Sequence, residues 1–478
     1  MKLFVYPLFA FFALIVVSCS NNDVNSDLSE CVASYVENDK TVITFGRIDV
    51  QTILDKAEYV KIPIFGELVS KEIQSVSSAL DIKSVYYAIN GPVDTRNNPE
   101  ATSLFFKVNN MDSLALALSQ RGYDTEEKGG KYYLYNGDVK VMFDEGLAIL
   151  RVENSKQKGF KNIEKAFDLS KKGKGKGNVK KFLAAEGDIT SFVSLEAAYV
   201  ETNEKIADLD ESKRDELKSL TKDGYIENSV RFEMGQLRIV NINHFNEKLQ
   251  AQKFFNADES GSVRNKLGKG QARLAVSVNL NFKNIQSFVD EFAPGAISNM
   301  IQDIGGPLQM AFMMAGGDIS NILSGQFAAA MFGEPKADGT LVPDFNFYAG
   351  FGPNGKPLAD LAKDFLKGGE IALSISPDAV MGASEESNLP VGSIPISVPA
   401  GAESFGKNTL TAFVNLEGAD MSSFEFEGAA ILIYLVKNVN MNYGATGGET
   451  IVRLKNSKQN VLKQAVDKML VEFEDLIN

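Results

Sequence analysis

Residues 190–198 read TSFVSLEAA and residues 411–419 read TAFVNLEGA, so six of nine positions are identical at a spacing of 221 residues. A second pair of segments, Arg47–Val50 and Ser277–Leu280, corresponds at a spacing of 230, and each member is expected to end a strand and open a helix. Correspondences that recur in the same order along a chain indicate an internal repeat. The sequence therefore predicts two copies of one structural unit.

The first copy shows which secondary structure the unit contains. Residues 42–48 alternate and are rich in β-branched side chains, which predicts a strand, and Asp49 suits the N-cap of a helix over 50–57. Three short apolar runs between residues 132 and 152, separated by Asn-Gly and Glu-Gly turns, predict an antiparallel meander. We expect an α+β fold with two similar halves, each a mainly antiparallel or mixed sheet packed with helices.

The expected domain boundaries follow from these patterns. The first α+β repeat is predicted over 34–255 and the second over 271–478, joined by a polar linker over 256–270. Residues 19–33 are polar and short, which favours a flexible tether that precedes the first repeat.

The N-terminus resembles a bacterial lipoprotein signal. Residues 14–19 read LIVVSC and end an apolar run that follows Lys2. We therefore predict a signal peptide over 1–18 and a lipidated Cys19 at the mature N-terminus. A transmembrane helix needs roughly 17 to 25 apolar residues, and this run is shorter and contains Pro7. Ser20, by resemblance to characterised lipoproteins, favours the outer membrane, without indicating its periplasmic or surface side.

Charge and cysteine content narrow the class of protein further. The net charge is −13, which disfavours nucleic-acid binding because that requires a basic surface against phosphates. Once Cys19 carries palmitate or another acyl chain, Cys31 has no intramolecular disulfide partner. It is expected to be a small buried side chain, an inert position in the tether or an intermolecular disulfide.

Several residues and segments suggest catalysis, but none of them forms a complete catalytic motif. Residues 350–357, GFGPNGKP, resemble a P-loop, but Pro357 replaces the Ser or Thr that would hold Mg²⁺. His244 is the sole histidine, which rules out zinc motifs built on several histidines, and a surface position at the start of a helix is expected for it. Glu425 and Glu427 share one strand face, whereas glycosidase carboxylates come from distant segments. We predict no catalytic residue, no cofactor and no metal site.

Residues 296–333 are rich in methionine, glycine and alanine, with Met300, Met310, Met313 and Met314 among them. Methionine lines adaptable apolar binding grooves and also fills ordinary cores. The pattern leaves both alternatives open, with the buried core favoured.

The signal, the tether and the segment VITFGRIDVQTILDKA over 42–57 resemble a lipoprotein family of the Bacteroidota that is catalogued as a domain of unknown function. Residues 317–319, GDI, and 325–328, GQFA, are similar to the second half of that family. The resemblance covers nearly all of the mature chain. It implies a cell-envelope location. It implies no activity and assigns no functional residue.

The expected function is that of a non-enzymatic, lipid-anchored envelope protein with a binding or scaffold role. Its candidate partners are the membrane, through the anchor, and an envelope protein, peptide or lipid. The alternative is a hydrolase that cleaves envelope polymers with a pair of carboxylates, which would need two acidic side chains facing one cleft.

Overall fold

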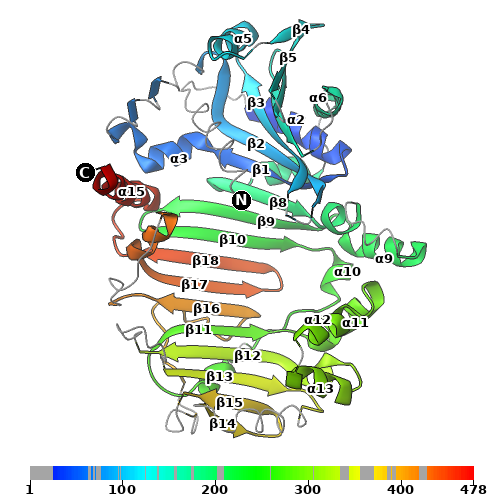
Figure 1. Cartoon of the computed structure of the whole chain (residues 1–478), viewed down its shortest axis with the longest axis vertical. Helices are drawn as coiled ribbons and strands as arrows, with labels where there is room; N and C mark the ends of the chain where they lie inside the picture. The colour runs from blue at the N-terminus through cyan, green and yellow to red at the C-terminus, as the bar shows by residue number, and fades with distance from the viewer. Residues whose placement is uncertain are drawn as a thin grey trace. The chain divides into compact units, whose positions relative to one another are not determined.

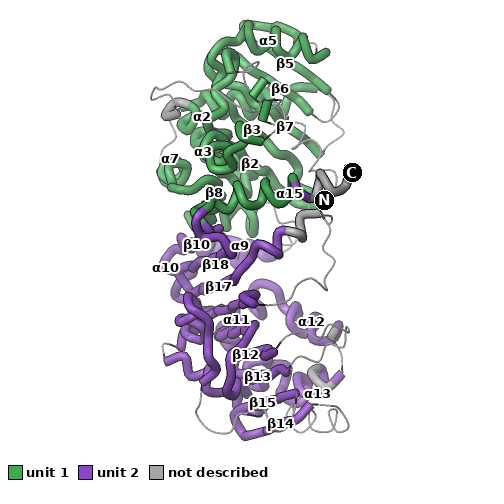
Figure 2. The backbone as a smooth tube through the Cα atoms, turned by 90° about the vertical axis from the view of Figure 1, so that its left-hand side faces the viewer, with its two compact units in different colours: residues 1–208, 221–234, 459–470 green, residues 209–220, 235–458, 471–478 purple. Residues whose placement is uncertain are grey.

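The computed structural model describes most of the chain from residue 25 to residue 477, and it divides this part into two compact units (Figures 1 and 2). Unit 1 holds the described residues up to 208 together with 221–234 and 459–470, and unit 2 holds 209–220, 235–458 and 471–477. The described range has gaps at 63–65, 68–69, 72–76, 95, 97, 124, 137–138, 155–158, 174–176, 202–208, 259, 305, 334–343, 356–370, 385–388, 390–394 and 419–427.

Unit 1 contains one antiparallel sheet with helices on both faces. Its strands pair in the order β4-β5-β6-β7-β3-β2-β1-β8-β9, and every pairing is antiparallel. The strands are β1 (Val42–Asp49), β2 (Leu80–Val93), β3 (Pro99–Val108), β4 (Glu126–Lys128), β5 (Lys131–Asn136), β6 (Val139–Phe143), β7 (Ala148–Glu153), β8 (Ile189–Ser194) and β9 (Tyr225–Glu233). The helices are α2 (Asn25–Asn38), α3 (Val50–Ala57), α5 (Met111–Gln120), α6 (Lys161–Lys171), α7 (Asn178–Leu183) and the first part of α15 (Val461–Ile477).

Adjacent side chains of a strand point to opposite faces, and the two cores of unit 1 follow from this alternation. Phe105 packs into the core beneath α2, α6 and α7, whereas Phe106 packs into the core beneath α3 and α5. Both phenylalanines are at most 2% exposed. The sheet of unit 1 is therefore buried on both faces.

The strands of unit 2 pair antiparallel in the order β14-β15-β13-β12-β11-β16-β17-β18-β10. The strands are β10 (Gln236–His244), β11 (Ala272–Asn279), β12 (Leu323–Phe332), β13 (Asp344–Phe351), β14 (Ala372–Ile375), β15 (Ala379–Ala383), β16 (Leu410–Asn415), β17 (Val436–Gly444) and β18 (Gly447–Leu454). The helices are α9 (Glu211–Thr221, through residue 220), α10 (Glu247–Gln250), α11 (Phe282–Phe292), α12 (Ala296–Ile304) and α13 (Gly306–Met314).

Loop segments and one short 3₁₀ helix, not α-helices, cover one face of the sheet in unit 2. Val263, Leu267, Ile396 and Phe405 from these segments pack against strand alanines such as Ala275, and all five are at most 3% exposed. Alanine side chains are short, so they let a loop backbone lie close to the sheet. Helices α11, α12 and α13 instead gather near the ends of β11 and β12 (Figure 1), around a smaller core that contains Ile301 and Phe312.

The predicted α+β class is confirmed, with antiparallel pairing of the strands in both units. The predicted strand over 42–48 is β1, and the helix over 50–57 is α3, whose N-cap carboxylate on Asp49 accepts a hydrogen bond from the Thr52 amide at 3.2 Å. The predicted meander is β5, β6 and β7.

The prediction of a flexible tether over 19–33 is wrong from residue 25 onward, because Asn25–Asn38 form helix α2. Leu28, Val32 and Tyr35 recur at the spacing of one helical face and are at most 3% exposed in the core of unit 1. The side chain of Cys31 is half-buried against the same core. Residues 19–24 lie outside the described residues.

The linker predicted over 256–270 is also different in the structure. Residues 262–266 form a short 3₁₀ helix, and Val263 and Leu267 are fully buried in the core of unit 2. The segment that was expected to end the first repeat, 235–255, belongs to unit 2 as well. This stretch is polar overall, so its composition did not indicate that Val263 and Leu267, four residues apart, are buried in the core.

Candidate functional site

Two polar clusters lie on sheet faces, one in each unit. The cluster of unit 1 centres on Arg151 of β7, whose guanidinium donates hydrogen bonds to Ser103 Oγ at 2.9 Å, Tyr35 Oη at 3.2 Å and Asn90 Oδ1 at 3.3 Å. Tyr35 Oη in turn donates to Asn90 Oδ1 at 2.9 Å. These bonds tie helix α2 to β2, β3 and β7.

A buried carboxylate completes this cluster. Glu153 accepts from Lys140 Nζ at 2.5 Å and from Arg151 Nε at 2.9 Å, and the three side chains are 2%, 3% and 9% exposed respectively. Burial raises the pKa of the Glu153 carboxyl, but the hydrogen bonds and charges of Lys140 and Arg151 outweigh it and hold the pKa below its ordinary value. Burial raises the pKa of the Tyr35 phenol.

Each oxygen of Glu153 has a hydrogen-bond donor, and the Arg151 guanidinium is bonded on several sides. A network that satisfies its own members has no open position for a ligand. The cluster of unit 1 is therefore a structural element that fixes α2 on the sheet.

The cluster of unit 2 lies on strand β17, where asparagine alternates with apolar residues. Asn438, Asn440 and Asn442 are two residues apart, so they share one face of the sheet. The register places Asn440 opposite Ile451 and Asn442 opposite Glu449 on β18. Asparagine is depleted in strands, so three on one face need an explanation beyond strand propensity.

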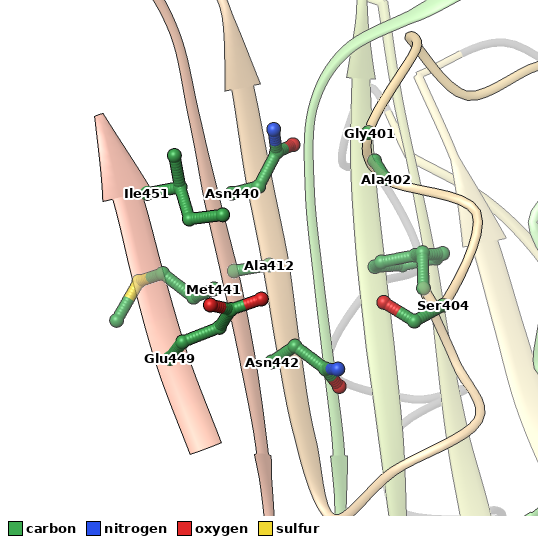
Figure 3. Close-up of a pocket in the computed structure, with 10 residues that line it drawn as sticks. Gly401, Ala402, Ser404, Ala412, Asn440, Met441, Asn442, Glu449 and Ile451 are labelled. Carbon is green, nitrogen blue, oxygen red and sulfur yellow. The ribbon is translucent and has the colours of Figure 1, made fainter. Parts of the chain in front are cut away.

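A loop over residues 401–406 lies across this face and leaves a hollow beside it (Figure 3). The loop is fixed by Phe405, whose ring meets Phe413 edge-on at 5.3 Å, and by the Gly406 amide, which donates to Thr411 Oγ1 at 2.7 Å. At Gly401 φ is +88°, and a Cβ there would lie 2.7 Å from Arg453 Nη1, so glycine lets the loop reach the strand.

The hollow has a volume of about 40 Å³. It is lined by four residues of the loop, Gly401, Ala402, Ser404 and Phe405, and by six strand residues, Ala412, Asn440, Met441, Asn442, Glu449 and Ile451. In Figure 3 the carboxylate of Glu449 is turned toward Ser404, and the amides of Asn440 and Asn442 lie on either side of it. A space of this size admits a few water molecules or one small functional group.

One polar atom of this hollow has no protein partner. Asn440 is 7% exposed, and its Oδ1 is buried and accepts no hydrogen bond from the described residues. Its Nδ2 donates to Asn438 Oδ1 at 3.2 Å. A buried acceptor without a donor costs about 1–3 kcal/mol, which a bound group that donates a hydrogen bond would recover.

Neighbouring groups fix which atom of the Asn440 amide is left unpaired. Arg453 Nη1 lies 3.3 Å from the Asn438 side chain, and a guanidinium only donates, so Asn438 must present its oxygen. Asn440 then contacts that same oxygen with its NH₂ group. The unpaired atom of Asn440 is therefore its oxygen.

Of the other expected site residues, His244 and Gly350 are described, and neither lines this hollow. His244 ends strand β10 and does not begin a helix, so that part of the prediction is wrong. Gly350 lies in β13, but Lys356 and Pro357 of the P-loop-like segment fall outside the described residues, as do Cys19, Glu425 and Glu427. No group of three or more His, Cys, Asp or Glu is placed to hold a metal within the described part of the chain.

Four methionines of the methionine-rich stretch are not the buried core that was favoured, whereas Met331 of β12 is half-buried. Met300 of α12 and Met310, Met313 and Met314 of α13 are 53%, 43%, 64% and 69% exposed. These helices bury Ile301, Ala311 and Phe312 and turn the methionines outward. The described pocket lies elsewhere in unit 2, at β17 and β18.

The residues of the hollow were missed because they come from segments that are far apart in sequence. One sequence signal was available, namely the run NVNMN at 438–442, where asparagine alternates with apolar residues. Such alternation indicates a strand face that does not pack against a plain apolar core.

Comparisons with known proteins do not assign the chain to a family. No protein-family model matches the chain, and no curated protein matches it. Among solved structures, crystal forms I, III and IV of TP0453 match at 10–11% identity, over 44–47% of this chain and 79–86% of TP0453. The TM-scores are 0.26, 0.28 and 0.27, so these similarities carry no argument about fold or function.

Proposed function

We propose that this chain is a lipid-anchored cell-envelope protein with a non-enzymatic binding role, and that its ligand enters the hollow of unit 2. The observation that carries the proposal is the buried Oδ1 of Asn440, which lacks a donor and belongs to a residue that lines the hollow. Of the described side-chain atoms that are buried without a partner, it is the one whose residue lines the hollow, and water or a ligand would satisfy it. The network of unit 1 is satisfied internally and offers no comparable position.

We also propose that the chain arose by duplication of one unit. In unit 1 the pairing order β7-β3-β2-β1-β8-β9 matches the order β15-β13-β12-β11-β16-β17 in unit 2, with every pair antiparallel. β1 and β11 begin 230 residues apart, and β8 and β16 begin 221 apart, which are the spacings of the sequence repeats. This common order supports the proposal.

The structure gives the hydrolase alternative no specific support. Glycoside hydrolysis needs two carboxyl groups on opposite sides of the bond to be cleaved. Among the described residues that line the hollow, Glu449 is the one carboxylate. A binding role needs no second acid.

Occlusion of the hollow tests the binding role. Ser404→Leu adds an apolar side chain at its wall, and Ser287→Leu on the exposed surface of α11 is the matched control. We expect purified wild-type protein and the Ser287 variant to release a bound small molecule on denaturation, whereas the Ser404 variant releases none. Mass spectrometry of the released molecules measures this. Equal release from all three proteins, or none from the wild type, would contradict the proposal.

The anchor is tested through the two cysteines. We expect Cys19→Ala to abolish incorporation of labelled palmitate and to move the protein into the soluble fraction, because the acyl chains attach at that sulfur. Cys31→Ala is the control and should remain labelled and membrane-bound, since Cys31 lies half-buried in α2. The assignment is wrong if the Cys19 variant is still labelled. None of the described helices is long and apolar enough to cross a membrane.

A further inference from the structure

We propose that the hollow of unit 2 binds a primary ammonium group, an inference that rests on the binding role proposed above. Three side chains that line it can accept hydrogen bonds. Asn440 offers a buried carbonyl oxygen, Glu449 a carboxylate and Ser404 a hydroxyl that can accept. A primary ammonium carries three N–H donors and no acceptor, so it matches this set.

The small volume of the hollow favours the binding of one end group of a ligand over the binding of a complete ligand. Pockets that enclose complete small ligands measure roughly 300–1,000 Å³, whereas this hollow is about 40 Å³. An ammonium on a short alkyl stem fits such a space, and its carbon atoms would lie beside Phe405 and Ile451. The remainder of the ligand would extend past Ser404 and Gly401, where the loop ends the enclosure.

The long distance between the Glu449 carboxylate and the guanidinium of Arg238 also favours a cation in the hollow. Glu449 is 40% exposed, and its Oε2 lies 3.8 Å from Arg238 Nη1, which is too long for a hydrogen bond. Its carboxylate is therefore only weakly paired by that arginine. A bound ammonium would form the shorter, charge-assisted hydrogen bond that this geometry lacks.

The strand register places the two principal acceptors, Asn440 and Glu449, on one face of the sheet, where both can reach one ammonium group. Glu449 faces Asn442 across the β17–β18 pair, so Asn440 is its diagonal neighbour on the same face. Diagonal neighbours in a sheet are about 7–8 Å apart at the backbone, which side chains of this length can bridge to a shared ligand. The Asn442 amide oxygen already accepts from Asn408 Nδ2 at 2.7 Å, which leaves Asn440 and Glu449 as the specific pair.

Calorimetric titration of the full mature chain in detergent tests the inference, with ethylammonium as the probe and ethanol as its neutral counterpart. We expect ethylammonium to bind and ethanol not to bind. Glu449→Gln should weaken ethylammonium at least about tenfold, because a charge-assisted bond becomes a neutral one. Asn440→Leu, which removes the second acceptor, should weaken it by a similar factor.

Glu417→Gln is the matched control, because Glu417 is a 62% exposed carboxylate of the same unit that pairs with Lys437 at 2.9 Å. Its affinity for ethylammonium should equal that of the wild type. Equal affinity in the Glu449 variant, or equal binding of ethanol, would overturn the ammonium assignment. If neither probe binds while Ser404→Leu still loses a retained molecule, the ammonium inference fails and the binding role stands.

A second pair of probes distinguishes two classes of ligand that could supply the ammonium group, a peptide lysine and a small free amine. Nα-acetyl-lysine amide presents the ammonium as a peptide side chain, whereas ethylammonium presents it as a free amine. Tighter binding of the lysine derivative indicates a peptide source, and tighter binding of ethylammonium a small amine. Nε-acetylation of the lysine derivative removes the charge, and we expect it to abolish binding; retained binding would contradict the proposal.

Discussion

Glu153→Gln should destabilise unit 1 by about 3–5 kcal/mol, because it leaves Lys140 and Arg151 as buried cations without their carboxylate. The three side chains are at most 9% exposed, so water cannot replace the lost interaction. Thermal unfolding of the full mature chain, followed by calorimetry, measures the effect. For a unit of this size the transition temperature should fall by on the order of 10 °C.

Glu186→Gln provides the control for this substitution. Its carboxylate also pairs with an arginine, Arg231 at 3.3 Å, but it is 88% exposed. Exposed pairs contribute about 0–1 kcal/mol, so the transition should barely move. A similar small effect from Glu153→Gln would show that the buried cluster is not what holds α2 on the sheet.

The pH dependence of the same variant follows from the lowered pKa of Glu153. A carboxyl whose pKa is lower in the folded state stabilises the protein above its unfolded pKa, about 4.3, and loses that contribution as pH falls through the folded value. The difference in stability between wild type and Glu153→Gln should therefore be largest near neutral pH and should shrink below about pH 4.

Phe192→Ala and Phe413→Ala should each cost about 3–5 kcal/mol, because both truncate a fully packed ring. Phe192 and Phe413 occupy the same position of the sequence repeat and are at most 1% exposed. Phe192 stacks on Phe45 at 5.4 Å and on Phe182 at 4.9 Å. The second ring, Phe413, meets Phe405 edge-on.

Amide hydrogen exchange shows which elements are destabilised by each of the two phenylalanine substitutions. Phe192→Ala should increase amide exchange in β1, β8 and α7, and Phe413→Ala should increase it in β11, β16 and the segment 401–406. Phe255→Ala, at a ring that is 38% exposed, is the control and should change exchange little. If the matched phenylalanines differ widely in cost, the two copies do not share a common core.

The parts of the fold that the sequence predicted correctly are those set by local contacts. Asp49 caps α3 through a bond to Thr52, three residues away, and the meander of β5, β6 and β7 is joined by short turns. Both features are visible in a short window of sequence. Long-range packing decided the features that were predicted incorrectly.

Helix α2 and the segment 262–267 illustrate this difference. Their polar residues resemble a tether and a linker, but Tyr35 bonds Asn90 and Arg151, while Leu267 is buried with strands β11 and β12. No local pattern shows that such partners exist. The polar hollow is a stronger case, because Ser404 and Glu449 are brought together only by the loop that crosses the sheet.

The most direct measurement of the central claim is the electron density of this hollow in crystals of the mature chain soaked with ethylammonium. The account predicts density for the ammonium within hydrogen-bond distance of Asn440 Oδ1 and the Glu449 carboxylate. A hollow closed by the 401–406 loop, with Asn440 Oδ1 bonded to a protein donor, would contradict it.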